Sequence, residues 1–294
     1  MSLAFASRRV EKLVLRSTVS FLFFLLVTAL SSAQSNVVPS TQPEHTNPVI
    51  LLETLSWDEA EHILTPDTVV VIALGAGSKE HGRHLQLNND FLIAEYLKKR
   101  VLDAGPQNIV IAPTINYSFY PAFLEYPGST SLSMDTARAM ITDIIRSLAH
   151  YGPRRFYILN TGISTLRPLA QAMTELSKDG IVLRYTDLTK DDPVEKKLRQ
   201  SGGTHADEIE TSMTLYIAPE TAHMKKAAKD LSPNQPGGLT RDQQGKGTYS
   251  PTGAWGDPTL ATREKGQAVV ESLVATILKE IDDLRKAAPP PPPK

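Results

Sequence analysis

Short apolar runs alternate with longer amphipathic segments through the middle of this 294-residue chain. The apolar runs are rich in β-branched residues and are bounded by turn residues, which is typical of buried strands. The amphipathic segments have apolar residues at helical spacing and end in glycine, a frequent helix stop. In chain order, these expected strands and helices cover residues 68–74, 90–105, 108–115, 133–152, 154–162, 166–180 and 181–188. Alternating strands and helices predict an α/β fold, with a mostly parallel sheet and helices on both faces.

The two ends of the chain differ from the middle in composition. A basic stretch, then the apolar run VSFLFFLLVTAL, then small residues before Gln34 form the pattern of a cleavable secretory signal. The apolar run is shorter than the ~20 residues that span a bilayer, although an uncleaved anchor is the alternative. We expect export to the periplasm or secretion, with no stable membrane insertion after cleavage. The predicted organisation is a signal peptide at 1–33, a flexible leader at 34–48, a single domain at 49–286 and a proline-rich tail at 287–294.

Composition limits the chemistry that is available. The chain has no cysteine, which excludes disulfides, thiolate nucleophiles and zinc–thiolate sites. Any metal must therefore be held by histidine, aspartate or glutamate. The formal net charge of -1 gives no reason to expect nucleic acid as a partner.

A polar loop follows the first expected strand, at the edge of the sheet where α/β proteins bind their ligands. The stretch KEHGRHLQLNND places His81, His84 and Asp90 within a few positions of one another. Imidazole and carboxylate groups together suit Zn²⁺, Mn²⁺ or Fe²⁺. A solvated polar loop is the alternative interpretation, and His84 fits a structural hydrogen-bonding role better than that of a ligand.

A second polar cluster lies much further along the chain, in the stretch HADEIETS. If residues 205–212 are helical, His205 and Glu208 share one face of the helix while Glu210 points elsewhere. A catalytic site built from several loops would need two such clusters. Charge at a helix N-terminus would explain the same residues without a site.

Four stretches in order resemble motifs of the creatininase (creatinine amidohydrolase) family, over residues 54–282. They are GSKEHGRHLQLNND, YSFYPAFLEYPGST, HADEIETS and GAWGDPTLATREKG. The resemblance implies an α/β sandwich around a parallel sheet, usually oligomeric. It also implies one or two divalent metals and hydrolysis of small, often cyclic, amides.

The chain departs from the family pattern at positions that bear on the metal. Lys79 stands where the family places a glutamate ligand, and Glu80 where it has glutamine. Gly162, in NTGIST, replaces a histidine ligand, and Phe123 replaces the histidine of the middle motif. An ammonium group cannot ligate a cation, so the second metal's ligand set is broken.

These comparisons lead to a single-metal hypothesis. His81, Asp90 and Glu210 are expected to hold one Zn, Mn or Fe ion, which would activate water and polarise the carbonyl of a small amide. The candidates for proton transfer are Glu80, His205 and Glu208. Lys79 is expected to stabilise the oxyanion in the role of the missing metal.

Two other functions remain open from the sequence. One is a non-catalytic small-molecule binding protein that descends from the same fold with a degraded metal site. The other is a metal-free hydrolase that uses Lys79 and Glu80.

Overall fold

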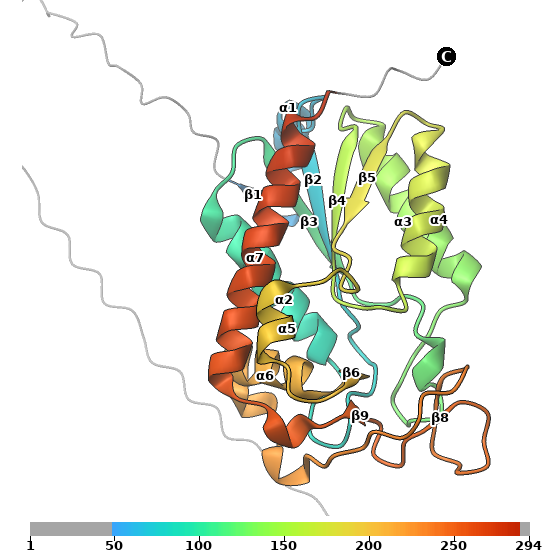
Figure 1. Cartoon of the computed structure of the whole chain (residues 1–294). Helices are drawn as coiled ribbons and strands as arrows, with labels where there is room; N and C mark the ends of the chain where they lie inside the picture. The colour runs from blue at the N-terminus through green and yellow to red at the C-terminus, as the bar shows by residue number, and fades with distance from the viewer. Residues whose placement is uncertain (1–48, 289–294) are drawn as a thin grey trace, which may run out of the picture. The chain divides into compact units, whose positions relative to one another are not determined.

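Five short apolar segments pair side by side as parallel strands in the computed structural model, which describes residues 49–288 (Figure 1). The strand order is β1-β3-β2-β4-β5, so the chain starts near one edge and crosses to the other. All six residues of the central strand β2 are buried, since it is paired on both sides and covered on both faces. The strands are β1 (Ile50–Leu51), β2 (Val69–Leu74), β3 (Ile109–Ile115), β4 (Arg155–Asn160) and β5 (Val182–Tyr185).

Helices cover both faces of this sheet (Figure 1). One face packs against α3 and α4, together with the short α1, and the other packs against α2 and α7. The helices are α1 (Trp57–Ile63), α2 (Asn89–Ala104), α3 (Met134–Ala149), α4 (Leu166–Ser177) and α7 (Arg263–Lys286).

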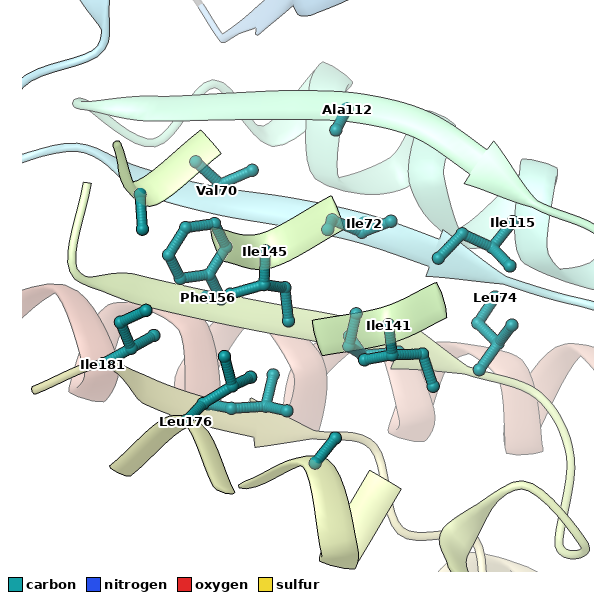
Figure 2. Packing of buried hydrophobic residues seen from close by; sticks show 14 of the residues in the cluster. Val70, Ile72, Leu74, Ala112, Ile115, Ile141, Ile145, Phe156, Leu176 and Ile181 are labelled. Atoms are coloured by element: carbon teal, nitrogen blue, oxygen red, sulfur yellow. The ribbon is translucent and has the colours of Figure 1, made fainter. Parts of the chain in front are cut away.

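Alternation of side chains along β2 builds two cores from one strand. Val70, Ile72 and Leu74 point toward α3 and α4, where Figure 2 shows them packed with other apolar side chains of that core. Val69 and Val71 point the other way, toward α2 and α7. Burial on both faces explains why this strand is a continuous apolar run in the sequence.

The chain between β5 and α7 forms smaller elements that surround the carboxyl edge of the sheet. Two helices and two small sheets belong to this part: α5 (Pro193–Leu198), α6 (Glu208–Ile217), β6 (Gly203–His205) with β9 (Trp255–Gly256), and β7 (Leu239–Thr240) with β8 (Thr248–Tyr249). Short 3₁₀ turns lie among them at Pro219–Thr221, Met224–Lys226 and Pro258–Leu260. A further 3₁₀ turn, Pro121–Phe123, lies between β3 and α3.

The predicted fold class is confirmed, and the predicted strands and helices occur with ends shifted by a few residues. Ser133 caps α3 by accepting a hydrogen bond from the Thr136 N–H, whereas Asp135 lies inside the helix. Gly105 ends α2 in a left-handed conformation, with φ 60°.

The predicted signal peptide (1–33), the leader (34–48) and most of the proline-rich tail lie outside the described residues. Within residues 49–288, no helix has both the length and the apolar character needed to cross a bilayer.

Candidate active site

The loop after β2 and the start of α2 bring a lysine, a histidine and an aspartate together. Lys79 and His81 lie in this loop, and Asp90 lies in the first turn of α2. The strand end and the helix approach closely at Gly75, where a Cβ atom would stand 2.4 Å from the Asp90 carbonyl oxygen. Glycine at this position therefore lets Asp90 sit beside the strand end.

His81, Asp90 and Glu210 form a triad in which the first two are buried and Glu210 is partly buried. The His81 Nε2 atom is 2.7 Å from Asp90 Oδ1 and 3.4 Å from Glu210 Oε1. One ligand atom from each of the three residues lies within 4.8 Å of the others. The structure thus brings together the three residues that the sequence analysis named as metal ligands.

The hydrogen bonds of His81 bear on whether this triad suits a metal. Its Nδ1 atom is 2.9 Å from the Lys79 carbonyl oxygen, which can only accept, so Nδ1 carries a proton. Nε2 then faces the Asp90 carboxylate, which also only accepts. Either a second ring proton or a divalent ion shared with Asp90 would satisfy this contact. A histidine whose other nitrogen donates to a carbonyl is the usual arrangement for a metal ligand, so the donor set fits one ion.

Lys79 places its ammonium group against the same aspartate. Nζ lies 2.7 Å from Asp90 Oδ2, and the rings of Phe123 and Tyr120 lie 4.8 and 5.6 Å away. Burial lowers the pKa of the Lys79 ammonium, but Asp90 and Glu210 outweigh it and raise that pKa above its ordinary value. Burial tends to raise the pKa of Asp90, yet Lys79 and His81 hold it well below its usual range. Lys79 and Asp90 therefore form an ion pair of an ammonium and a carboxylate.

Glu80 and His205 form a second buried pair, from residues far apart in the chain. His205 Nε2 lies 2.9 Å from Glu80 Oε1, and the Phe123 ring packs on the imidazole at 4.4 Å between centroids. Burial lowers the pKa of His205, but Glu80 outweighs it, so the pKa is raised. The Gly82 N–H donates to Glu80 Oε2 at 2.8 Å and fixes the carboxylate. A proton held between these two groups is positioned for transfer.

The helix α6 differs from the expectation for residues 205–212. His205 lies on β6, Ala206 has a positive φ of 47°, and Asp207 caps a helix that begins only at Glu208. Glu210 consequently turns back toward the cluster and accepts a hydrogen bond from the Ala206 N–H at 2.6 Å. The expectation that Glu210 would point away from His205 was wrong, because the chain is not helical at His205.

Glu208 does not join the cluster, so its assignment to proton transfer is corrected. Its side chain pairs with Lys265 and accepts hydrogen bonds from the N–H groups of Gln200 and Ser201, at 2.8 and 2.9 Å. Burial tends to raise its pKa, but Lys265 and these N–H groups lower it. Glu208 is a fully buried structural carboxylate that ties α6 to α7 and to the preceding loop.

A cavity of about 550 Å³ opens onto these groups. Lys79, His205, Glu210 and the indole of Trp255 all line it. The strand-end loop at 161–164 also lines it, whereas Asn160 folds back to hydrogen-bond Gly162, Thr165 and Thr186. Asn160 thus ends its strand and fixes the loop, and it does not line the cavity.

Two site residues escaped the sequence analysis. Tyr120 lies against Lys79, and Phe123, noted only as a replacement, covers both Lys79 and His205. No spacing in the sequence indicates these contacts, because both residues come from an irregular loop. His84 donates to or accepts from Thr211 Oγ1 at 2.8 Å, and burial lowers its pKa to about 4, as befits a structural neutral imidazole.

Fold and site together define an α/β protein with a buried, metal-compatible polar cluster at the carboxyl end of its sheet. The chain belongs to the creatininase family, whose model, described as creatinine amidohydrolase, matches residues 53–281. The creatinine amidohydrolase of Pseudomonas putida is 28% identical over 257 residues, covering 80% of this chain and 96% of the relative. The mycofactocin precursor peptide peptidase of Mycobacterium ulcerans is 25% identical, covering 72% and 84%. These relatives are hydrolases.

Solved structures agree on the fold. A crystal structure of creatinine amidohydrolase superposes with a TM-score of 0.67 at 24% identity, covering 82% of this chain and 99% of the other. A manganese form of creatininase superposes with a TM-score of 0.67 and covers 81% of this chain and 100% of the other. A creatininase variant described as Zn–Zn type superposes with a TM-score of 0.64 and covers 81% of this chain and 98% of the other. Both are 24% identical to this chain. At this sequence identity the structural likeness establishes the fold alone. The manganese and zinc ions are properties of the matched proteins.

Proposed function

We propose that the protein is an amidohydrolase that cleaves the C–N bond of a small amide, cyclic amides included. The observation that supports it is one cavity lined by Lys79, His205 and Glu210, whose partners Asp90, Glu80 and His81 contact them, in a chain of the creatininase family. A cavity of about 550 Å³ is within the range of small-molecule sites.

The proposed cofactor is one divalent ion, Zn, Mn or Fe, held by His81, Asp90 and Glu210. When bound, the ion would act as a Lewis acid. The ammonium of Lys79 supplies a fixed positive charge beside the triad, where it stabilises negative charge that develops on the carbonyl oxygen.

His205 is the group proposed to exchange protons with the leaving amine. Glu80 holds the ring through Nε2, which leaves Nδ1, 3.8 Å from Glu210 Oε2, as the atom for exchange. Glu80 outweighs burial and raises the pKa of His205, which favours the protonated ring that a general acid requires. Phe123 packs on the ring, at 4.4 Å between centroids, and helps to hold its orientation.

The test is amine release from a panel of linear and cyclic small amides, with metal-stripped and metal-reloaded protein. We expect turnover in the reloaded protein, and at least a ~100-fold loss in Glu80→Gln and His205→Gln, the usual scale of a general acid–base contribution. Glu208→Gln is the matched control, since Glu208 is a buried glutamate outside the cluster. Equal losses in all three variants would contradict the roles of Glu80 and His205.

A non-catalytic binding protein is the second candidate. The ion pair between Lys79 and Asp90 favours it, because part of the negative charge in the cluster is already compensated by the chain itself. Saturable binding of an amide without turnover, in metal-stripped and reloaded protein alike, would support this function over hydrolysis.

We further propose export and self-association. Export is supported by the sequence pattern of residues 1–33, and a secreted protein that begins at Gln34 in intact-mass measurement would agree with it. Self-association is supported by the family resemblance.

A further inference from the structure

We infer that the Lys79 ammonium is a built-in cation of the His81–Asp90–Glu210 triad, which restricts this site to one divalent ion and weakens the binding of that ion. The inference deepens the proposed function and rests on it in one respect, since it takes the triad as the ion site. It concerns occupancy and affinity, which are measured without catalysis.

The two oxygens of Asp90 are already engaged on different sides. Oδ1 is 2.7 Å from His81 Nε2, on the side of the triad. Oδ2 faces Lys79 Nζ at 2.7 Å, the distance of a charge-assisted hydrogen bond that the ammonium donates. A carboxylate that bridges two metal ions with one oxygen on each needs both of its oxygens free. Lys79 occupies the Oδ2 side of Asp90, where a second ion bridged in this way would bind.

The ammonium cannot easily leave this position. Lys79 is only 5% exposed, and its ammonium lies near the rings of Phe123 and Tyr120, 4.8 and 5.6 Å from their centroids. Its backbone N–H donates to the Leu87 carbonyl at 2.8 Å, so the loop that carries it is also fixed. Swinging the group out to water would break the contacts with both rings and leave Asp90 uncompensated.

The positive charge of Lys79 should weaken the binding of a divalent ion at the triad. Three carboxylates, Glu80, Asp90 and Glu210, favour a cation here, but Lys79 supplies one at ion-pair distance from Asp90. Two positive charges a few ångströms apart repel strongly in a buried site, where water screens them poorly. Lys79 also competes for the same aspartate. Removing the ammonium should therefore tighten ion binding.

The experiment is titration of the metal-stripped protein with Zn²⁺ and Mn²⁺ by calorimetry, with elemental analysis of the saturated protein. The variants are Lys79→Met, Lys79→Gln and Lys79→Arg. Lys98→Met is the control, because Lys98 is also a largely buried lysine paired with a carboxylate, Glu95, at 2.8 Å. We expect at least a ~10-fold gain in affinity in the Met and Gln variants and none in the Arg or Lys98 variants.

Every outcome bears on the inference. It is overturned if the unmodified protein binds two ions per chain, or if the neutral variants bind no more tightly than it does. Gln keeps an N–H donor for Asp90, which makes that variant the more conservative of the two. Should neither neutral variant fold, the stoichiometry of the unmodified protein decides: one ion per chain supports the inference, and none or two contradict it. A protein that binds no ion until Lys79 is replaced would support the inference while contradicting the metal-dependent form of the proposed function. Absence of amide turnover with the expected binding pattern would contradict the function alone.

Discussion

Gly253 is the residue on which the position of Glu80 depends. It has a φ of +83°, and a Cβ atom added to it would lie 2.3 Å from Glu80 Oε2. In Gly253→Ala the carboxylate must move, and its bonds to His205 and to the Gly82 N–H would be lost. We expect amide turnover to fall by about 10- to 100-fold, the scale of a misplaced catalytic group.

The comparison for this prediction is Gly105→Ala at the end of α2. Gly105 also has a positive φ, +60°, but a Cβ atom there meets nothing within 4 Å. Both variants should lose about 1–2 kcal/mol of unfolding free energy from the left-handed conformation. Only Gly253→Ala should lose activity, in a measurement of turnover per folded molecule; an equal loss at Gly105 would refute the steric explanation.

Glu208 provides a pH-dependent contribution to stability at the residue scale. Its folded pKa lies below its ordinary value of 4.5, because Lys265 and two N–H groups outweigh burial. The stabilisation is therefore complete above about pH 4.5 and is lost as the pH falls through the folded pKa. We expect Glu208→Gln to cost about 2 kcal/mol at pH 7 and progressively less in acid, in urea unfolding between pH 3 and 7. A cost independent of pH would contradict a charged Glu208.

At the scale of elements, the N-terminus of α6 positions Glu210. Asp207 accepts hydrogen bonds from the N–H groups of Ile209 and Glu210, at 2.9 and 3.0 Å, and pairs with Arg199. Losing this cap should fray the first turn and move Glu210 away from His81. We expect Asp207→Ala to cost about 1–2 kcal/mol of stability and to weaken metal binding.

Ser133→Ala is the matched variant, because Ser133 caps α3 away from the cluster. It should cost about 1 kcal/mol in thermal or urea unfolding. Metal affinity, measured by calorimetry, should change in Asp207→Ala and stay the same in Ser133→Ala. If both caps are equally neutral for metal binding, α6 does not position the ligand.

The sequence predicted the sheet better than the elements that follow it, and the reason is burial. Strands such as β2 are apolar on both faces, so their composition alone marks them. The turn at Ala206 carries no such mark, since alanine rarely adopts a positive φ and here the Asp207 cap and the Glu210 carboxylate hold it. The D-x-x-E spacing of Asp207 and Glu210 resembles a capping box, and would have indicated that the helix begins after His205.

At the scale of the molecule, topology explains what could be predicted of the site. Parallel strands end at one edge, so the loop after β2 was expected at a binding site. The sequence named His81, Asp90, Glu210, Glu80 and His205, and the structure brings them together. It could not show that Lys79 contacts Asp90 or that Glu208 faces Lys265, because these contacts depend on the packing of α6, α7 and irregular loops.

The sheet should also separate the two cores energetically. Ile145 on α3 and Ile277 on α7 are both about fully buried, but they pack on opposite faces. Ile→Val at each should cost about 0.5–1.5 kcal/mol. Because the two side chains belong to separate cores, the double variant should cost the sum of the single changes to within about 0.5 kcal/mol in urea unfolding.

The comparison pair is Ile141 and Ile145, which lie in one core, one helical turn apart. The cost of this double variant should depart from the sum of the single changes, because each side chain relaxes into the space that the other leaves. Additivity in both pairs would mean that side chains within one core relax independently, whereas non-additivity across the sheet would mean that β2 and β4 transmit repacking from one face to the other.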